Sequence, residues 1–188
     1  LNTEEDITNS LASLKNTFPA LKKAVIKLNA GFSGEGNAIF SLEGALMNAQ
    51  LTVWIKESLP ERLQIVARAL KFAGFMEKFQ IMGGIVKAFV EGACKESPSV
   101  QCRITPVGST DIISTHSQVL GGESGQVFLG AHFPSNTEYA VAIGEIGKKI
   151  TEKLKTYGVL GRFSVDFISV KENDQWKHYA IEINLRKG

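Results

Sequence analysis

The chain has 188 residues, of which 44% are hydrophobic, 21% charged and 9% aromatic, and its formal net charge is +2. A disordered chain would hold fewer apolar residues and more net charge, and a basic nucleic-acid binder would carry a clear positive excess. No apolar run approaches the roughly 20 residues that cross a bilayer, and the polar, acidic start is unlike a signal peptide. Cys94 and Cys102 are its only cysteines, which fits a reducing cytoplasm. We therefore expect a globular cytoplasmic protein that binds neither membrane nor nucleic acid.

The first half of the chain is expected to alternate helices and strands. Thr3 and Asp6 have the spacing of a capping box, and apolar residues follow at helical spacing. Pro60 fits the first turn of a second helix, whose apolar residues would lie on one face. In order, we predict a helix from Thr3 to about Pro19, a strand at 24–28, a glycine-rich turn at 29–36, a returning strand at 37–42 and a helix at 60–72.

The second half is expected to be richer in strands. Gly83 and Gly84 interrupt the pattern and suggest a boundary between two lobes, residues 1–83 and 84–188. In order, we predict strands at 85–92, 100–107 and 112–120, a loop at 121–125, a helix from Ser135 or Asn136 to about Tyr157, and strands at 162–170 and 177–185. These elements predict an α+β protein of two lobes.

The strongest functional signal lies in the last predicted hairpin. Asp166 alternates with aromatic and aliphatic residues and so points away from the apolar face. If the hairpin is symmetric about Asp174, Asp166 lies opposite Glu182, with Cβ atoms roughly 4.5–5.5 Å apart. Two such carboxylates repel unless a proton or cation lies between them, and Asn184 adds a neutral oxygen. This all-oxygen set suits Mg²⁺ or Mn²⁺; the alternative is a solvated polar face.

A second signal is the lysine that leads into the glycine-rich turn. Lys27 lies near the end of the predicted strand, and Gly31, Gly34 and Gly36 follow. Glycines let the backbone approach a ligand closely, and backbone N–H groups with a nearby lysine can hold phosphate. The spacing matches neither common phosphate-binding glycine motif. The alternative is an ordinary hairpin turn.

The remaining polar residues carry weaker signals. Arg103 lies in a predicted strand, where it could contact an anionic substrate or, alternatively, only solvent. The histidines His116, His132 and His178 are dispersed, and we expect them to be structural or solvated. No nucleophile elbow of the Gly-x-Ser-x-Gly type is present.

Taken in order from about Leu21 to Lys187, these motifs resemble the ATP-grasp superfamily. Residues 24–37 resemble its strand, phosphate-binding lysine and glycine-rich flap, and residues 87–92 resemble its hinge. Residues 163–167 and 181–186 resemble its paired metal-binding strands, and their Glu-x-Asn-x-Arg motif is the most specific element. The end of the chain also resembles ATP-grasp proteins of the carboxylate–amine (peptide) ligase type.

The resemblance implies an ATP-grasp fold, in which two α+β lobes with antiparallel sheets grip ATP between them. Residues 1–83 would form the lobe with the flap, and residues 84–188 the lobe with the hinge and the metal-binding hairpin. Mg²⁺, or Mn²⁺, would be held by Asp166, Glu182 and Asn184, while Arg186 and Lys27 would act catalytically on the phosphates. The residues implied to bind the nucleotide are Lys27, Ser33, Gly34, Glu35, Gly36, Asn37, Lys87, Phe89, Val90 and Glu91.

The implied activity is ATP-dependent ligation of a small-molecule carboxylate to an amine, through an acylphosphate. Family members usually carry a further N-terminal domain, and this sequence begins with Leu1 rather than methionine, so we expect a fragment of a longer enzyme. Two alternatives remain open: a kinase of the same fold that phosphorylates a hydroxyl, and a non-catalytic nucleotide-binding regulatory module.

Overall fold

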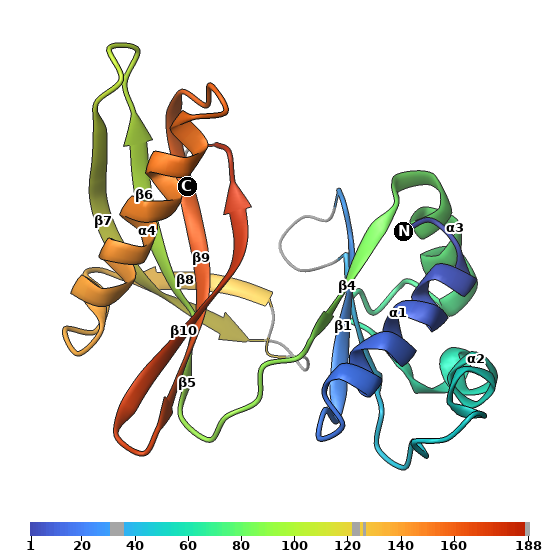
Figure 1. Ribbon diagram of the computed structural model, residues 1–188. Helices are drawn as coiled ribbons and strands as arrows, with labels where there is room; N and C mark the ends of the chain where they lie inside the picture. Colours follow the sequence, from blue (N-terminus) through green and yellow to red (C-terminus); the bar gives the residue numbers. More distant parts are fainter. Residues whose placement is uncertain (31–35, 122–124, 126, 187–188) are drawn as a thin grey trace. The chain divides into compact units, whose positions relative to one another are not determined.

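The structure, a computed structural model, describes residues 1–30, 36–121, 125 and 127–186. It divides into two compact units, each with its own helices and sheet (Figure 1). The first unit comprises Leu1–Phe89 and Gly121–Val127, and the second comprises Val90–Leu120 and Phe128–Gly188. The division after Phe89 falls slightly beyond the glycine pair that suggested a lobe boundary. Helices and antiparallel strands occur in both units, which confirms the predicted α+β class.

In the first unit, an antiparallel sheet is covered on one face by helices (Figure 1). Its strand order is β3-β2-β1-β4. The helix-facing positions of β1 and β2 are buried at alternate residues, as Ala24, Ile26 and Phe40 show. The elements are α1 (Glu4–Thr17), β1 (Lys23–Leu28), β2 (Asn37–Ser41), α2 (Leu51–Arg62), β3 (Leu63–Ile65), α3 (Phe72–Met82) and β4 (Gly84–Ala88).

The start of α1 has the predicted cap. The Asp6 N–H donates to Thr3 Oγ1 at 3.0 Å, and the Thr3 N–H donates to Asp6 Oδ2 at 2.9 Å. These bonds satisfy donors that the first turn of a helix leaves without an intrahelical partner. The capping box is confirmed.

In the second unit, a larger sheet packs against one long helix. The strand order is β10-β9-β6-β7-β8, and β5 also pairs with β9. A Cβ on Gly147 of the helix would lie 2.8 Å from Val100 Cγ1, so the helix approaches the sheet too closely for a larger residue. The elements are β5 (Lys95–Glu96), β6 (Pro98–Ile104), β7 (Thr110–Gly121), β8 (Val127–His132), α4 (Ala140–Lys155), β9 (Gly161–Glu172) and β10 (Gln175–Asn184).

The segment between β2 and β4 differs from its prediction. Residues 60–72 do not form one helix: Leu63–Ile65 is a strand that pairs with β2, and α2 and α3 lie on either side of it. Pro60 lies near the end of α2 rather than in a first turn. Leu63, one of the apolar residues at helical spacing, instead lies in the edge strand of the sheet, opposite Phe40.

Smaller differences concern element bounds. The regular part of helix α4 begins at Ala140, and Asn136 begins the turn that leads into it: the Glu138 N–H donates to Asn136 Oδ1 and the Ala140 N–H donates to the Asn136 carbonyl, both at 3.0 Å. Strands β5 and β8 were not predicted. Cys102 is buried, whereas Cys94 is exposed. Within the described residues, no helix combines the length and apolar character that crossing a membrane requires.

Candidate functional site

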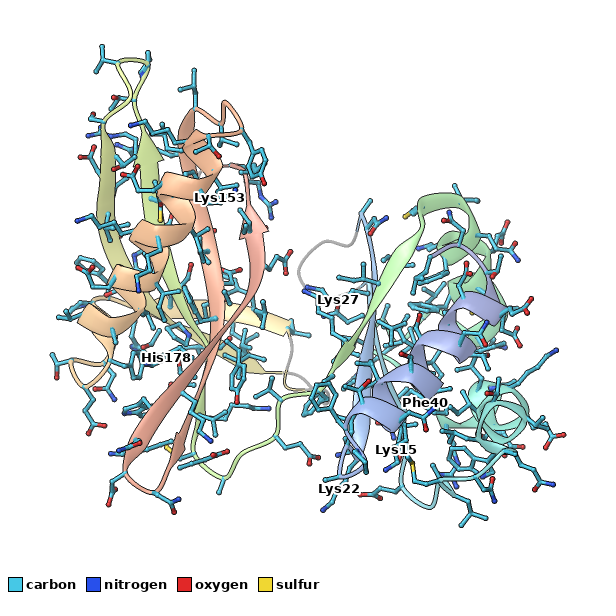
Figure 2. All side chains as sticks on the ribbon, in the orientation of Figure 1. Lys15, Lys22, Lys27, Phe40, Lys153 and His178 are labelled. Atoms are coloured by element: carbon cyan, nitrogen blue, oxygen red, sulfur yellow. The ribbon has the colours of Figure 1, made fainter. Side chains whose placement is uncertain are left out.

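The first unit presents Lys27 on the face of its sheet that the helices leave open. Lys27 lies opposite Asn37 of β2 and Ile85 of β4. Its neighbours Ile26 and Leu28 are buried on the helix side, and alternation turns Lys27 the other way. Figure 2 shows Lys27 on the side of the sheet away from the helices, whereas Phe40 lies beneath them.

The same open face carries a second lysine, in β4. Lys87 lies opposite Val25, two residues along β1 from Lys27, which makes the two lysines diagonal neighbours on adjacent strands. At the end of this row, Lys23 Nζ lies 5.9 Å from the centre of the Phe89 ring. Apolar Val25 lies between Lys23 and Lys27 on the strand. The face therefore carries positively charged and apolar side chains next to each other, which suits a ligand that has both an anionic and an aromatic part.

The sequence did not predict that Lys27 and Lys87 are neighbours. It placed Lys27 before the flap and Lys87 in the hinge, as separate motifs. Only the antiparallel pairing of β1 with β4 brings them together, and local periodicity cannot reveal which distant strands pair.

The other nucleotide-binding candidates lie close to these strands in the chain. The Leu28 N–H donates to the Gly36 carbonyl at 2.9 Å, so Gly36 closes the turn and Asn37 begins β2. Val90 is half-buried and Glu91 exposed, directly after the end of the first unit. The remaining candidates, Ser33, Gly34 and Glu35, lie outside the described residues.

In the second unit, Asp166 of β9 lies directly opposite Glu182 of β10, as the sequence predicted. Directly opposed residues have Cβ atoms roughly 4.5–5.5 Å apart. Asn184, two residues further along β10, donates from Nδ2 to Asp166 Oδ2 at 2.9 Å. Phe163, Val165 and Phe167 are buried against α4, so alternation sets Asp166 on the opposite face of the sheet.

The pairing is produced by a different turn from the expected one. The turn consists of two residues, Asn173 and Asp174, both with positive φ (49° and 59°), and Gln175 already pairs with Glu172. With that turn alone, Asp166 would lie opposite Ile181. A bulge between Ala180 and Glu182 shifts the register by one residue and restores the pair.

The donor set fits a hard divalent cation. Hydrogen bonding from Nδ2 leaves Asn184 Oδ1 as a neutral oxygen beside two carboxylates. Within the part of the chain that is described, no three His, Cys, Asp or Glu side chains gather at one point. Two carboxylates and an amide oxygen would leave several positions for water and phosphate, the coordination that Mg²⁺ prefers.

Further polar residues lie on this face of the second sheet and just after its last strand. Ser99 of β6 lies opposite Asp166, and Arg103 lies opposite Arg162 at the other end of the paired segment. Arg186 is exposed just after β10, and its N–H donates to the Asn184 carbonyl at 2.7 Å. The sequence singled out Arg103 but missed Arg162, whose significance depends on the pairing of β6 with β9.

The model of the IQCH-like ATP-grasp family matches residues 45–186. This match covers α2 to the end of the β9–β10 hairpin. No curated protein sequence matches the chain.

Solved structures with the same fold include several nucleotide complexes. An ADP complex of purK, N5-carboxyaminoimidazole ribonucleotide synthetase, has a TM-score of 0.65 and 14% identity, and covers 100% of this chain and 39% of that chain. The biotin carboxylase domain dimer of Hydrogenobacter thermophilus 2-oxoglutarate carboxylase, with MgADP, ADP and bicarbonate, has a TM-score of 0.61 and 15% identity, with coverages of 95% and 33%. A β-γ-ATP complex of Campylobacter jejuni biotin carboxylase has a TM-score of 0.59 and 16% identity, with coverages of 94% and 34%.

This chain therefore spans between 33% and 39% of the length of these three structures. At such identities, the likeness shows the fold. The family match and the shared fold agree with the order of motifs in the sequence: the chain belongs to the IQCH-like ATP-grasp family.

Proposed function

We propose that the chain binds Mg·ATP and activates a small-molecule carboxylate for ligation to an amine. The observation that carries this proposal is the opposed pair Asp166 and Glu182, joined by the bond from Asn184 to Asp166. Opposed carboxylates destabilise a sheet unless a cation or proton lies between them. A metal–nucleotide complex supplies that cation, and solved structures of the same fold contain ADP, MgADP or an ATP analogue.

The residues of each unit have distinct tasks in this proposal. In the first, Lys27 and Lys87 hold phosphate oxygens, together with the backbone of Gly36 and Asn37 and the flap residues Ser33, Gly34 and Glu35. Where the chain passes from the first unit to the second, Phe89, Val90 and Glu91 bind the base and ribose. In the second, Asp166, Glu182 and Asn184 hold Mg²⁺, which neutralises phosphate charge when bound.

The proposed reaction has two steps. A carboxylate oxygen of the substrate attacks the γ-phosphorus, the bond to the β,γ-bridging oxygen breaks, and ADP leaves. The amine nitrogen then attacks the acyl carbon of the acylphosphate, inorganic phosphate leaves, and the amine loses a proton as the carbon–nitrogen bond forms. Arg186 and Lys27 stabilise the negative charge on the transferring phosphoryl group, because positioning and charge neutralisation dominate this chemistry.

The metal pair is tested by nucleotide titration. We expect Asp166→Asn and Glu182→Gln to abolish the Mg²⁺-dependent part of ATP affinity, measured by isothermal titration calorimetry with and without Mg²⁺. Neither change should lower the unfolding midpoint, because each removes carboxylate repulsion. Glu172→Gln, near the turn of the same hairpin, is the matched control and should leave ATP affinity unchanged. Equal Mg·ATP affinity in all three variants and the wild type would contradict the proposal.

The acylphosphate is tested by trapping with hydroxylamine, which converts an activated acyl group into a hydroxamate. With a panel of carboxylic acids and Mg·ATP, we expect ADP and hydroxamate to form in equal amounts. A stable phosphoester formed from a hydroxyl substrate would indicate a kinase. ATP binding with neither product across the panel would indicate a regulatory module.

A further inference from the structure

Two arginines face each other on the open face of the second sheet. Arg103 of β6 lies directly opposite Arg162 of β9, and the register between these strands is unbroken from Ser99 to Ile104. Because alternate residues share a face, Arg103 and Arg162 lie on the same face as Ser99 and Asp166. Like charges directly opposite each other destabilise a sheet. Asp111 already offsets part of the charge on Arg103, and an anion bound between the two arginines would offset the remaining positive charge.

The two guanidinium groups differ in their hydrogen-bond partners. Arg103 donates from Nε and Nη2 to Asp111 Oδ2, at 3.0 and 2.7 Å, which fixes its orientation and leaves its other N–H groups available. Arg162 is exposed and has no hydrogen-bond or ion-pair partner within the described ranges. The pair thus combines one oriented arginine with one that is free to close on a ligand.

The position of this pair along β9 indicates what it would contact. At one end of β9, Val170 pairs with Lys95, which follows Val90 and Glu91 closely in the chain. Asp166 lies in the middle, and Arg162 lies four residues further on. With the base held near Val90 and the phosphates at Asp166, the arginine end is the side from which an acceptor would approach.

We propose that Arg103 and Arg162 bind a second anionic group of the carboxylate substrate, so that the enzyme selects acids that carry two anionic groups. This inference rests on the proposed ligase function and deepens it. Four residues of strand place the arginine row about 13 Å from Asp166 and about 7 Å beyond the level of Asn184 and Ser164. A short chain between the reacting carboxylate and the second anion would span the latter distance. Asp111 acts as a positioning residue for Arg103.

The first experiment observes the arginines directly, without nucleotide. The Nε–H signals of Arg103 and Arg162 are assigned in NMR spectra by their loss in Arg103→Gln and Arg162→Gln. We expect both signals to shift during titration with adipate, and not with adipamate, in which an amide replaces one carboxylate. A parallel titration with 6-phosphonohexanoate shows whether a phosphonate or a carboxylate is preferred. Signals that do not move with either dianion would overturn the inference.

The second experiment measures selectivity with Mg²⁺ and a non-hydrolysable ATP analogue bound. By calorimetry, we expect adipate to bind at least ten-fold more tightly than adipamate. Arg103→Gln and Arg162→Gln should each remove most of this preference, and Arg162→Lys should retain part of it by keeping the charge. Lys177→Gln is the control, because Lys177 is also an exposed cation of this sheet with one carboxylate partner, Glu172.

The outcomes separate the two proposals. Nucleotide affinity that is unchanged in the arginine variants, with loss of the dianion preference, supports the inference. Equal affinity for adipate and adipamate, or an equal loss in Lys177→Gln, overturns it while leaving nucleotide binding intact. Absence of any Mg·ATP binding defeats the ligase function, and the NMR titration still decides whether the arginine pair binds a dianion.

Discussion

Lys27 is fixed in the middle of a sheet, and Lys87 is its diagonal neighbour on the adjacent strand. Each charge-assisted hydrogen bond contributes roughly 1.5–3 kcal/mol. We therefore expect Lys27→Ala and Lys87→Ala each to weaken ATP binding about ten-fold or more, with little change in adenosine binding, as measured by calorimetry.

Lys22 provides the control for this comparison. It is exposed and directly precedes β1, so Lys22→Ala changes the net charge equally without touching the open face. Its ATP affinity should stay close to that of the wild type. Equal weakening of ATP and adenosine by Lys27→Ala would show that Lys27 supports the sheet rather than the phosphates.

His178 is a single residue with a clear expected effect of pH on stability. It lies against the Tyr139 ring and shares a hydrogen bond with Ser169, and burial lowers its pKa below the ordinary value of 6.5. Because the unfolded chain then binds the proton more readily than the folded one, the free energy of unfolding is highest above the unfolded pKa. It should fall as the pH drops through 6.5 and level off below the folded pKa.

Chemical denaturation at a series of pH values measures this slope. In His178→Gln, the part of the slope due to this residue should vanish. His132→Gln is the control, since His132 is exposed on β8, and its slope should match the wild type. A His178→Gln variant with an unaltered slope would show that another group titrates in this range.

Among the elements, the β9–β10 hairpin explains why the sequence could predict that Asp166 and Glu182 lie opposite each other. Alternating apolar residues marked both strands, and the pair followed from counting outward from Asp174. The count assumed that the hairpin is symmetric about Asp174, whereas the structure has a two-residue turn at Asn173 and Asp174 and one bulge. These two errors cancel. Neither the turn length nor the bulge could be predicted from the local sequence. Several residue pairs between 172 and 175 are compatible with a turn, and a bulge has no reliable sequence signature.

The turn itself gives a prediction about stability. Asn173 and Asp174 both have positive φ, which two-residue hairpin turns require and which asparagine and aspartate tolerate better than β-branched residues do. Asp174→Val should lower the free energy of unfolding by about 1–3 kcal/mol, whereas Asp174→Gly should leave it unchanged or raise it. Denaturant unfolding of the two variants measures the difference. Equal stability would show that the turn conformation is not under strain.

The N-terminus of α1 is a second element whose sequence signal was sufficient. Thr3 and Asp6 bond reciprocally, and loss of an N-cap side chain typically costs about 1 kcal/mol. Thr3→Ala should therefore lower the free energy of unfolding by about that amount. Thr17→Ala, at the other end of the same helix, should have a smaller effect, because Thr17 bonds only to the Ser13 carbonyl behind it. The reverse order would contradict the capping role.

The region from α2 to α3 shows where element prediction fails. Leu63 and neighbouring apolar residues had helical spacing, yet Leu63–Ile65 completes the sheet beside β2. Pro60 is accommodated near the end of α2, although proline more commonly begins a helix. The choice between helix and edge strand depends on whether β2 has an open edge to fill, which is a property of the assembled sheet.

At the scale of the molecule, the chain has two separate hydrophobic cores. Ile26 is completely buried in the first and Ile143 in the second. Removing one buried methyl group typically costs about 0.5–1.5 kcal/mol. We expect Ile26→Val to accelerate amide hydrogen exchange mainly in β1, and Ile143→Val mainly in β9. Equal acceleration in both strands by either variant would show that the two cores unfold as one.

Prediction succeeded for the class and family of the whole molecule. Ordered motifs were enough for the family, and Lys27, Asp166 and Glu182 lie on strands whose alternation is visible. The pairing of distant strands could not be predicted, because it depends on contacts between residues that are far apart in the sequence. For the same reason, the sequence did not single out Arg162: its position opposite Arg103 follows only from the pairing of β6 with β9.

The bulge in β10 also bears on how this hairpin can change in length over evolution. A two-residue turn with a bulge and a three-residue turn without one both set Asp166 against Glu182. A relative can therefore gain a residue at the turn and lose one near Ile181, and keep the two carboxylates opposite each other. A sequence alignment with such a relative would contain two gaps, although the carboxylate pair is retained in both proteins. Alignments of this family should accordingly be anchored on the Asp166 and Glu182 strands, and the turn between them left free to vary.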